Sequence, residues 1–337
     1  MAPGGGLAGA GAGIASDGTN VYWFMGTFGG APFTLLECAA AGCAMVPTPI
    51  AMNINPAAGL GFFGSAGPNL LVTGGTNLFW PDGSNVQRSP FMTPAASSFH
   101  MGTAVNQPSQ VATDAAFVYW ADAKASMIYK CALGSTCTTP TVVVNLTGTQ
   151  GGTPEGGVPE AGGTDSGLLA VIQPPQLIAV DTTFIYWTDQ SGDINSQLLT
   201  GGPPVTILDN FHNPNFPPLP TAILAYDGIV YWVVGLGGGP VTLQVISACP
   251  ANASCTASPG VYNADPDAVA MATDGTDLYW TEVAPPAVKK CKLGLTCASP
   301  TTLVTLGPTY SPGDIAVDST HTYWLDSPSG EVLEGDK

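Results

Sequence analysis

The stretch Phe184-Ile-Tyr-Trp-Thr-Asp189 decides the fold, because its Tyr-Trp core recurs along the whole sequence. Each copy holds one of the seven tryptophans, which are Trp23, Trp80, Trp120, Trp187, Trp232, Trp280 and Trp324. Consecutive tryptophans lie 57, 40, 67, 45, 48 and 44 residues apart. Apart from two longer intervals, this spacing matches the roughly 40 to 50 residues of a four-stranded propeller blade. Seven copies therefore predict seven blades in one domain.

The repeat unit is clearest in residues 107–146. Its four predicted strands are Gln110–Asp114, Phe117–Ala121, Ser126–Cys131 and Pro140–Asn145. Such short runs of β-branched and aromatic residues, separated by Gly, Pro, Asp and Asn, are typical of strands. We therefore expect an all-β fold, a single seven-bladed β-propeller of four-stranded antiparallel blades with little or no helix.

The predicted blades span residues 12–50, 68–106, 107–146, 170–209, 220–264, 267–307 and 312–337, with a flexible Gly/Pro-rich insertion at 147–167. No sequence remains after the third strand of the last blade to supply a fourth. An open strand edge is a template for pairing. We expect residues 4–11 to complete the blade, or a neighbouring molecule to add a strand and chain subunits head to tail.

An Ala-x-Asp triplet precedes the aromatic pair in six blades. Its aspartates are Asp17, Asp114, Asp181, Asp227, Asp274 and Asp318. A carboxylate before a tight turn can accept hydrogen bonds from the turn amides, so these residues are predicted to cap Asx-type turns. The second blade has Val72 and Gly74 at these places and is expected to be the least regular.

The Tyr-Trp pairs are predicted to form the core between blades. Adjacent residues of a strand point to opposite faces, so each ring of a pair should pack against a different neighbouring blade. An exposed aromatic platform for a carbohydrate is the alternative.

The eight cysteines form four local pairs, Cys38/Cys43, Cys131/Cys137, Cys249/Cys255 and Cys291/Cys297. An even number in repeated local pairs indicates disulfides and an oxidising compartment. Zinc is the alternative, but zinc knuckles normally use closer spacings that converge in fours. We expect each disulfide to lie between the third and fourth strands of its blade and to staple that hairpin.

The amino-acid composition limits the classes of partner that the protein can bind. The formal net charge is −17, with 7 Lys plus Arg against 24 Asp plus Glu, which disfavours nucleic acid. No apolar run is long enough to span a membrane. The first residues lack the basic and apolar regions of a secretory signal, so no signal peptide is expected in this chain.

Catalytic motifs are missing from the sequence. His100, His212 and His321 fall in different blades without a nucleophile motif nearby, and no phosphate loop is found. No cofactor is expected. Asp267 and Asp314, at the starts of innermost strands, are the residues that could hold a channel calcium ion. The segment 210–220 carries Phe211, His212 and Phe216 and is a candidate interaction loop. Asn145 and Asn252 begin glycan acceptor triplets.

Tyr186-Trp-Thr-Asp189 and Tyr279-Trp-Thr-Glu282 resemble the YWTD repeats of lipoprotein-receptor ectodomains. The looser pattern of Ile-Ala-Val-Asp, a turn and Tyr-Trp is also similar to secreted bacterial β-propeller repeat proteins. The resemblance concerns the fold and implies an extracellular location.

These observations favour a secreted, non-enzymatic scaffold, structural or protein-binding, at the cell surface or in the extracellular matrix. Self-assembly through the incomplete last blade belongs to this reading. The alternatives are an extracellular lyase- or lactonase-like propeller with a channel metal, and a carbohydrate-binding module.

Overall fold

The computed structural model describes residues 10–27, 30–40, 42, 47–54, 70–82, 85–91, 97–100, 108–147, 175–189, 191–209, 220–236, 243–255, 260–263, 267–327 and 329–337. These residues form 27 β-strands and no helix. The predicted all-β class is therefore confirmed. In this part of the chain there is also no helix that is long and apolar enough to cross a membrane.

The strands fall into seven sheets, which we call blades one to seven. Blade one consists of β1 (Ala10–Ser16), β2 (Asn20–Thr27), β3 (Gly30–Ala39) and β4 (Thr48–Ile54). Blade two consists of β5 (Val72–Gly74), β6 (Asn77–Asp82), β7 (Asn85–Pro90) and β8 (Ser97–His100). Blade three consists of β9 (Pro108–Thr113), β10 (Phe117–Asp122), β11 (Met127–Ala132) and β12 (Thr141–Asn145). Blades four to six consist of β13 (Pro175–Val180), β14 (Phe184–Asp189), β15 (Ile194–Leu198) and β16 (Val205–Leu208); β17 (Ala222–Tyr226), β18 (Ile229–Leu236), β19 (Leu243–Pro250) and β20 (Gly260–Asn263); β21 (Ala268–Thr273), β22 (Asp277–Val283), β23 (Pro286–Lys292) and β24 (Thr301–Thr305). Blade seven consists of β25 (Pro312–Val317), β26 (His321–Asp326) and β27 (Glu331–Asp336).

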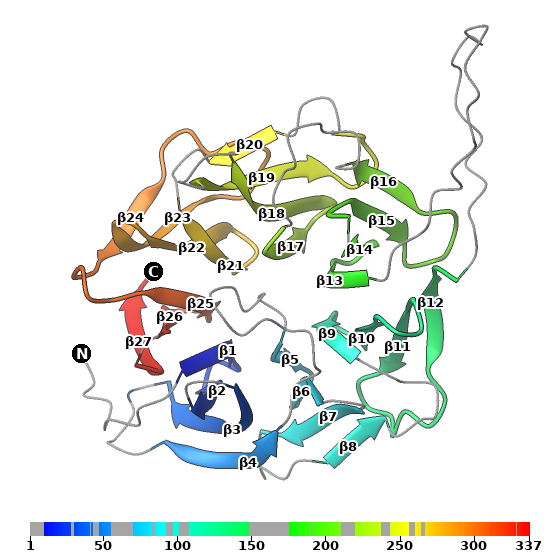
Figure 1. The fold of residues 1–337 in the computed structure, drawn as a ribbon, viewed down its shortest axis with the longest axis horizontal. Coiled ribbons are helices and arrows are strands. Elements are labelled where there is room, and N and C mark those ends of the chain that lie inside the picture. The colour runs from blue at the N-terminus through cyan, green and yellow to red at the C-terminus, as the bar shows by residue number, and fades with distance from the viewer. Residues whose placement is uncertain are drawn as a thin grey trace, which may run out of the picture.

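Each blade is an antiparallel meander whose strand order follows the sequence. Figure 1 shows the seven sheets arranged around a central axis, with the first strand of each blade nearest to it. The predicted seven-bladed propeller is confirmed. Blade two contains the shortest strand that the structure describes, the three-residue β5.

The start of β1 corrects one expectation about the closing blade. Ala10 and Gly11 were predicted to lie in the outer strand of blade seven, but they pair with Gly26 and Met25 in β2 of blade one. A Cβ atom at Gly11 would meet Leu325 of blade seven at 3.0 Å, so glycine allows this close approach. Residues 4–9 lie outside the described residues.

The core lies between blades, because each of the seven hydrophobic clusters joins two adjacent blades. The two rings of each aromatic pair face opposite neighbours, as predicted. Tyr186 of blade four packs with Trp232 of blade five, and Trp187 packs with Tyr119 of blade three. In every blade the first ring of the pair faces the following blade and the tryptophan faces the preceding one.

The third and fourth strands pair with the same irregularity in blades two to six. The register shifts once, which leaves one bulged residue in the fourth strand. The bulged residues are Phe99, Val143, Ile207, Tyr262 and Leu303. All five are apolar or aromatic.

Candidate functional site

Five of the six aspartates of the Ala-x-Asp triplets form the same set of hydrogen bonds, which we call the Asp–Tyr clamp. In Asp114, Oδ1 accepts the backbone N–H groups of Ala116 and Phe117, both at 2.7 Å. Its Oδ2 accepts the hydroxyl of Tyr119 at 2.7 Å. The other four clamps are Asp17 with Tyr22, Asp181 with Tyr186, Asp274 with Tyr279 and Asp318 with Tyr323.

The clamp ties the turn after the first strand to the tyrosine of the Tyr-Trp pair. Burial raises the pKa of Tyr119, and the hydrogen bond to Asp114 raises it further. The hydroxyl is therefore held as a donor to the carboxylate. Sequence reasoning found the turn cap but missed the tyrosine, although the constant spacing of five residues between aspartate and tyrosine was a visible signal.

Blades two and five lack the clamp for different reasons. Blade two has Gly74 and Phe79 at the two positions, so the carboxylate and the hydroxyl are missing together. In blade five, Asp227 and Gly228 both have positive φ, 49° and 75°, which is typical of a two-residue hairpin turn. There the hydroxyl of Tyr231 accepts the backbone N–H of Gly294 in blade six instead, at 2.9 Å.

Disulfides join Cys131 to Cys137, Cys249 to Cys255 and Cys291 to Cys297. Cys43 lies outside the described residues, so its predicted pairing with Cys38 stays a prediction.

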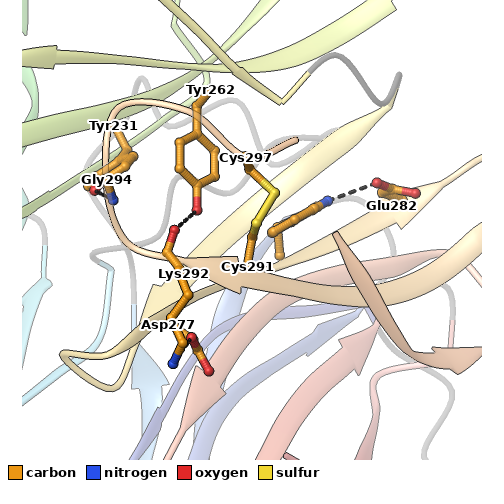
Figure 2. The surroundings of a disulfide bond; sticks show 9 residues. Tyr231, Tyr262, Asp277, Glu282, Cys291, Lys292, Gly294 and Cys297 are labelled. Carbon is orange, nitrogen blue, oxygen red and sulfur yellow. Dashed lines mark hydrogen bonds and ion pairs between the residues drawn. A yellow bond between two sulfur atoms is a disulfide. The ribbon is translucent and has the colours of Figure 1, made fainter. Parts of the chain in front are cut away.

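Two of the three disulfide loops also hold the preceding blade through a cysteine N–H, which sequence reasoning did not predict. The backbone N–H of Cys297 donates to the carbonyl of Tyr262 at 2.7 Å, and the Tyr262 hydroxyl donates to the carbonyl of Lys292 at 2.6 Å. Figure 2 shows Tyr262 of blade five beside the Cys291–Cys297 disulfide of blade six. Cys255 N–H donates in the same way to the carbonyl of Ile207 at 2.7 Å. The loops therefore connect blades as well as strands.

The first strands surround a central channel of about 260 Å³. Residues of these strands line it, among them Ile14, Ala112, Ala179, Ile223 and Met271, whose side chains pack into the clusters between blades. Asp314 of β25 is the one acidic residue among the lining residues.

Asp314 connects the last blade to the first. Its Oδ2 accepts the backbone N–H of Gly13 in β1 at 2.7 Å, and the side chain is buried. Burial raises the pKa of Asp314 to about 7, although the hydrogen bond from Gly13 acts in the opposite direction. The carboxyl group thus changes protonation near neutral pH.

Asp267 and Asp314, the two residues that could hold calcium, do not both line the channel in the described part of the chain. Asp267 lies before β21 with a φ of 74° and is absent from the channel lining. His321 contacts Thr320 and Asp336 on blade seven. Within the described ranges there is no group of three or more His, Cys, Asp or Glu side chains that could hold a metal. A channel calcium ion therefore stays the alternative to the expected absence of a cofactor.

The candidate loop residues Phe211, His212 and Phe216 lie outside the described residues, as does the insertion from residue 148 onward. All seven tryptophans are buried, with at most 3% of their surface exposed. The Tyr-Trp pairs therefore offer no exposed ring to a sugar.

Besides the channel, a second candidate surface is the outer edge of blade seven. β27 pairs with β26 and, within the described residues, with no fourth strand. A groove of about 320 Å³ lies beside it. The groove is bounded by blade one (Val21, Cys38, Ala39), by blade six and the segment after it (Val304 to Gly307, Tyr310), and by blade seven (Tyr323, Trp324, Val332, Leu333, Glu334).

No protein-family model matches the sequence, and no curated protein matches it. Solved propellers do match the structure. Virginiamycin B lyase from Staphylococcus aureus, a catalytically inactive variant with quinupristin, is 11% identical over 98% of this chain and 96% of that one, with a TM-score of 0.58. YCF48 bound to a D1 peptide is 8% identical over 100% and 95%, with a TM-score of 0.58. A chain of the nidogen/laminin complex is 17% identical over 78% and 89%, with a TM-score of 0.48.

The chain resembles the virginiamycin B lyase and YCF48 structures in its fold. At these identities the likeness to the solved structures concerns the fold alone, and enzymes as well as binding proteins share it. The chain itself offers two candidate surfaces, the channel and the edge of β27.

Proposed function

We propose that this chain is a non-enzymatic, disulfide-stabilised scaffold that acts outside the cell and binds protein through the open edge of β27. The observation that carries the proposal is that blade seven has three strands in the described part of the chain, with an apolar groove beside the third. An exposed strand edge offers a row of backbone donors and acceptors to an added strand. The three disulfides support an oxidising, extracellular setting.

The lining of the channel supports a scaffold more than an enzyme. Its one carboxylate, on Asp314, already accepts the amide of Gly13, and its other lining residues are mainly apolar. A lyase-like reaction would need an acid or base facing a substrate together with a group that stabilises the developing charge. We therefore place the binding function at the edge of β27.

A cis-capped variant tests this proposal. Blade six serves as the template for adding a fourth strand to blade seven. Lys292 at the end of its third strand occupies the same register position as Asp336 in β27. A copy of residues 294–305, with serine in place of Cys297, is appended after Lys337 to fill the edge. The matched control carries the same addition with aspartate in place of Leu303, which should not pack.

A random-peptide display library is then selected against the wild type, the capped variant and the control. The proposal expects peptides that bind the wild type and the control and are lost on the capped variant. Peptides that bind all three proteins equally well, or an absence of selected peptides, would contradict a protein-binding role for this edge.

A further inference from the structure

Blades four and five show what a fourth strand contributes to the next blade. Ile207 is the bulged residue of β16, and its side chain packs in one cluster with Val230, Cys249 and Ala251 of blade five. Its carbonyl accepts the backbone N–H of Cys255 at 2.7 Å. The bulged residue therefore fills a depression beside the disulfide hairpin of the following blade.

Blade five presents the same arrangement to blade six. Tyr262 is the bulged residue of β20, and it packs in one cluster with Leu278 and Cys291. Its carbonyl accepts the N–H of Cys297 at 2.7 Å. An isoleucine and a tyrosine thus occupy equivalent depressions, so the site accepts apolar side chains of different size.

Blade one repeats this depression on the side that faces blade seven. Val21 pairs with Cys38, as Val230 pairs with Cys249 and as Leu278 pairs with Cys291. Val21 and Cys38 line the groove beside β27. In blades five and six this place is taken by the fourth strand of the preceding blade, and the groove is the corresponding slot between blades seven and one.

The register of β27 defines how a strand would pair there. Val332 pairs with Leu325, the residue after Trp324, as Val288 pairs with Thr281 after Trp280. In blade six the bulge falls between Val288 and Lys289. The equivalent bulge in blade seven falls between Val332 and Leu333, both of which line the groove.

We propose that this slot binds an extended segment of another protein, with an apolar bulged residue flanked by β-branched residues and by lysine or arginine. This inference rests on the proposed function and names the chemistry of its partner. The apolar residue would pack against Val21 and Cys38, and the backbone would pair with Val332 and Leu333. The fourth strands of the chain itself, such as Thr-Thr-Leu-Val-Thr at 301–305, give the pattern.

The negative charge of β27 determines which residues should flank the apolar residue of the bound segment. β27 carries Glu331, Glu334 and Asp336 within six residues, and Glu334 is exposed and lines the groove. The neighbouring Lys337 already contacts Asp274 at 2.7 Å. The local surface is therefore acidic and favours a basic partner.

A second copy of this chain fits the slot less well. Its formal net charge is −17, and two β27 edges would bring like-charged carboxylates together. The segment before β1 is also disfavoured by spacing. Met271 pairs with Trp280, and the bulged residue Tyr262 of the preceding strand lies nine residues before it. Ile14 pairs with Trp23 in the same way, but Leu7, the apolar residue that would serve as the bulged residue, lies only seven residues before it.

The test uses a fluorescein-labelled peptide, Lys-Thr-Thr-Leu-Val-Thr-Lys, and fluorescence anisotropy with the wild-type chain. We expect saturable binding that is lost on the cis-capped variant. Replacing the leucine of the peptide by aspartate should weaken binding about 100-fold, because a charge cannot enter the apolar depression without a partner. Replacing both lysines by glutamates should weaken it about fivefold. N-methylation of the amides on one edge of the peptide should abolish binding, and on the other edge should leave it unchanged.

Glu334→Lys should reverse the preference between the lysine and glutamate peptides. Asp336→Lys makes the same change in charge on the same strand, but at a carboxylate that is 98% exposed and outside the groove, so it should leave most of the preference intact. An equal effect of both substitutions would show that net charge, and not the groove, selects the peptide.

Three outcomes would overturn the inference. Peptides selected by display that bind the edge but are acidic would contradict the partner chemistry while leaving the proposed function in place. The wild-type chain could self-associate, lose this self-association in the cis-capped variant, and keep it in the presence of the peptide. That result would identify a second copy as the occupant. A tenfold gain in peptide affinity on deleting residues 1–9 would identify that segment as the occupant.

Discussion

Asp314 accepts a hydrogen bond from the backbone amide of Gly13 at 2.7 Å, across 301 positions of sequence. The contact joins the first strands of blades seven and one, where the propeller closes. In blade six the fourth strand contacts the following blade through Val304. At the closure the described residues supply this buried polar contact and one hydrophobic cluster.

Asp314 should make the stability of the propeller depend on pH near neutrality. Burial raises its pKa to about 7, against about 3.9 in an unfolded chain. Between these values the folded state binds more protons, so the free energy of unfolding falls as pH rises, by up to about 1.4 kcal/mol per pH unit. Asp314→Asn should flatten urea-denaturation midpoints between pH 5 and 8.

Asp189 provides the matched control for this experiment. Burial, and then the charge of Asp193, raises its pKa to about 6. Asp189→Asn should therefore alter the pH dependence mainly below pH 6. If Asp314→Asn leaves the slope between pH 6 and 7 unchanged, the carboxyl group is not protonated in the folded protein.

Lys337 should stabilise the contact between blades six and seven. Its Nζ contacts Asp274 Oδ2 at 2.7 Å and lies 5.5 Å from the centre of the Tyr279 ring. Burial acts to raise the pKa of Asp274, but hydrogen bonds from Lys337, two backbone amides and Tyr279 together lower it below its usual range. This stabilisation is present above pH 4 and is lost as pH falls through the lowered pKa.

Lys337→Met should lower the free energy of unfolding by about 1 kcal/mol at pH 7. The difference from the wild type should shrink as pH falls below 4, as measured by chemical denaturation. A difference that stays constant down to pH 2 would mean that the ammonium group acts through the Asp318 carbonyl or the Tyr279 ring, and not through the Asp274 carboxylate.

The Asp–Tyr clamp should stabilise each blade that has it. Tyr119→Phe removes the hydroxyl that donates to Asp114 at 2.7 Å, and we expect a loss of about 1–2 kcal/mol in the free energy of unfolding. Phe79→Tyr is the reverse change in blade two. Because Gly74 supplies no carboxylate there, the added hydroxyl should also destabilise the protein, by about 1–3 kcal/mol. Thermal denaturation of both variants checks the pair, and a stabilising Phe79→Tyr would contradict the clamp.

The disulfide loops should protect the preceding blade against local opening. Replacing both Cys249 and Cys255 by alanine should cost about 2 kcal/mol from chain entropy alone. Because Cys255 N–H also holds the carbonyl of Ile207, hydrogen exchange should become faster in β16 as well as in β19 and β20. The doubly substituted Cys131/Cys137 variant is the control, since it should leave β16 unchanged. Faster exchange confined to blade five would reduce the disulfide to a hairpin staple.

Features that are local and repeated could be predicted from the sequence. The Tyr-Trp spacing predicted the number of blades, because every copy must bury the same two rings between neighbouring sheets. Contacts between blades could not be predicted. The pairing of Gly13 with Asp314 and of Cys255 with Ile207 depends on the angle between adjacent sheets, which no single repeat encodes. The groove beside β27 was foreseen only as a missing strand, and its apolar wall on blade one became visible when the registers of Val21 and Val230 could be compared.

The hydrophobic clusters lie between blades, whereas each Asp–Tyr clamp lies within one blade. This arrangement has a mechanical consequence. A pulling force applied along the chain would break an interface before it broke a clamped turn. The propeller should therefore lose whole blades in succession, and a stretched molecule should lengthen in steps that correspond to one repeat at a time.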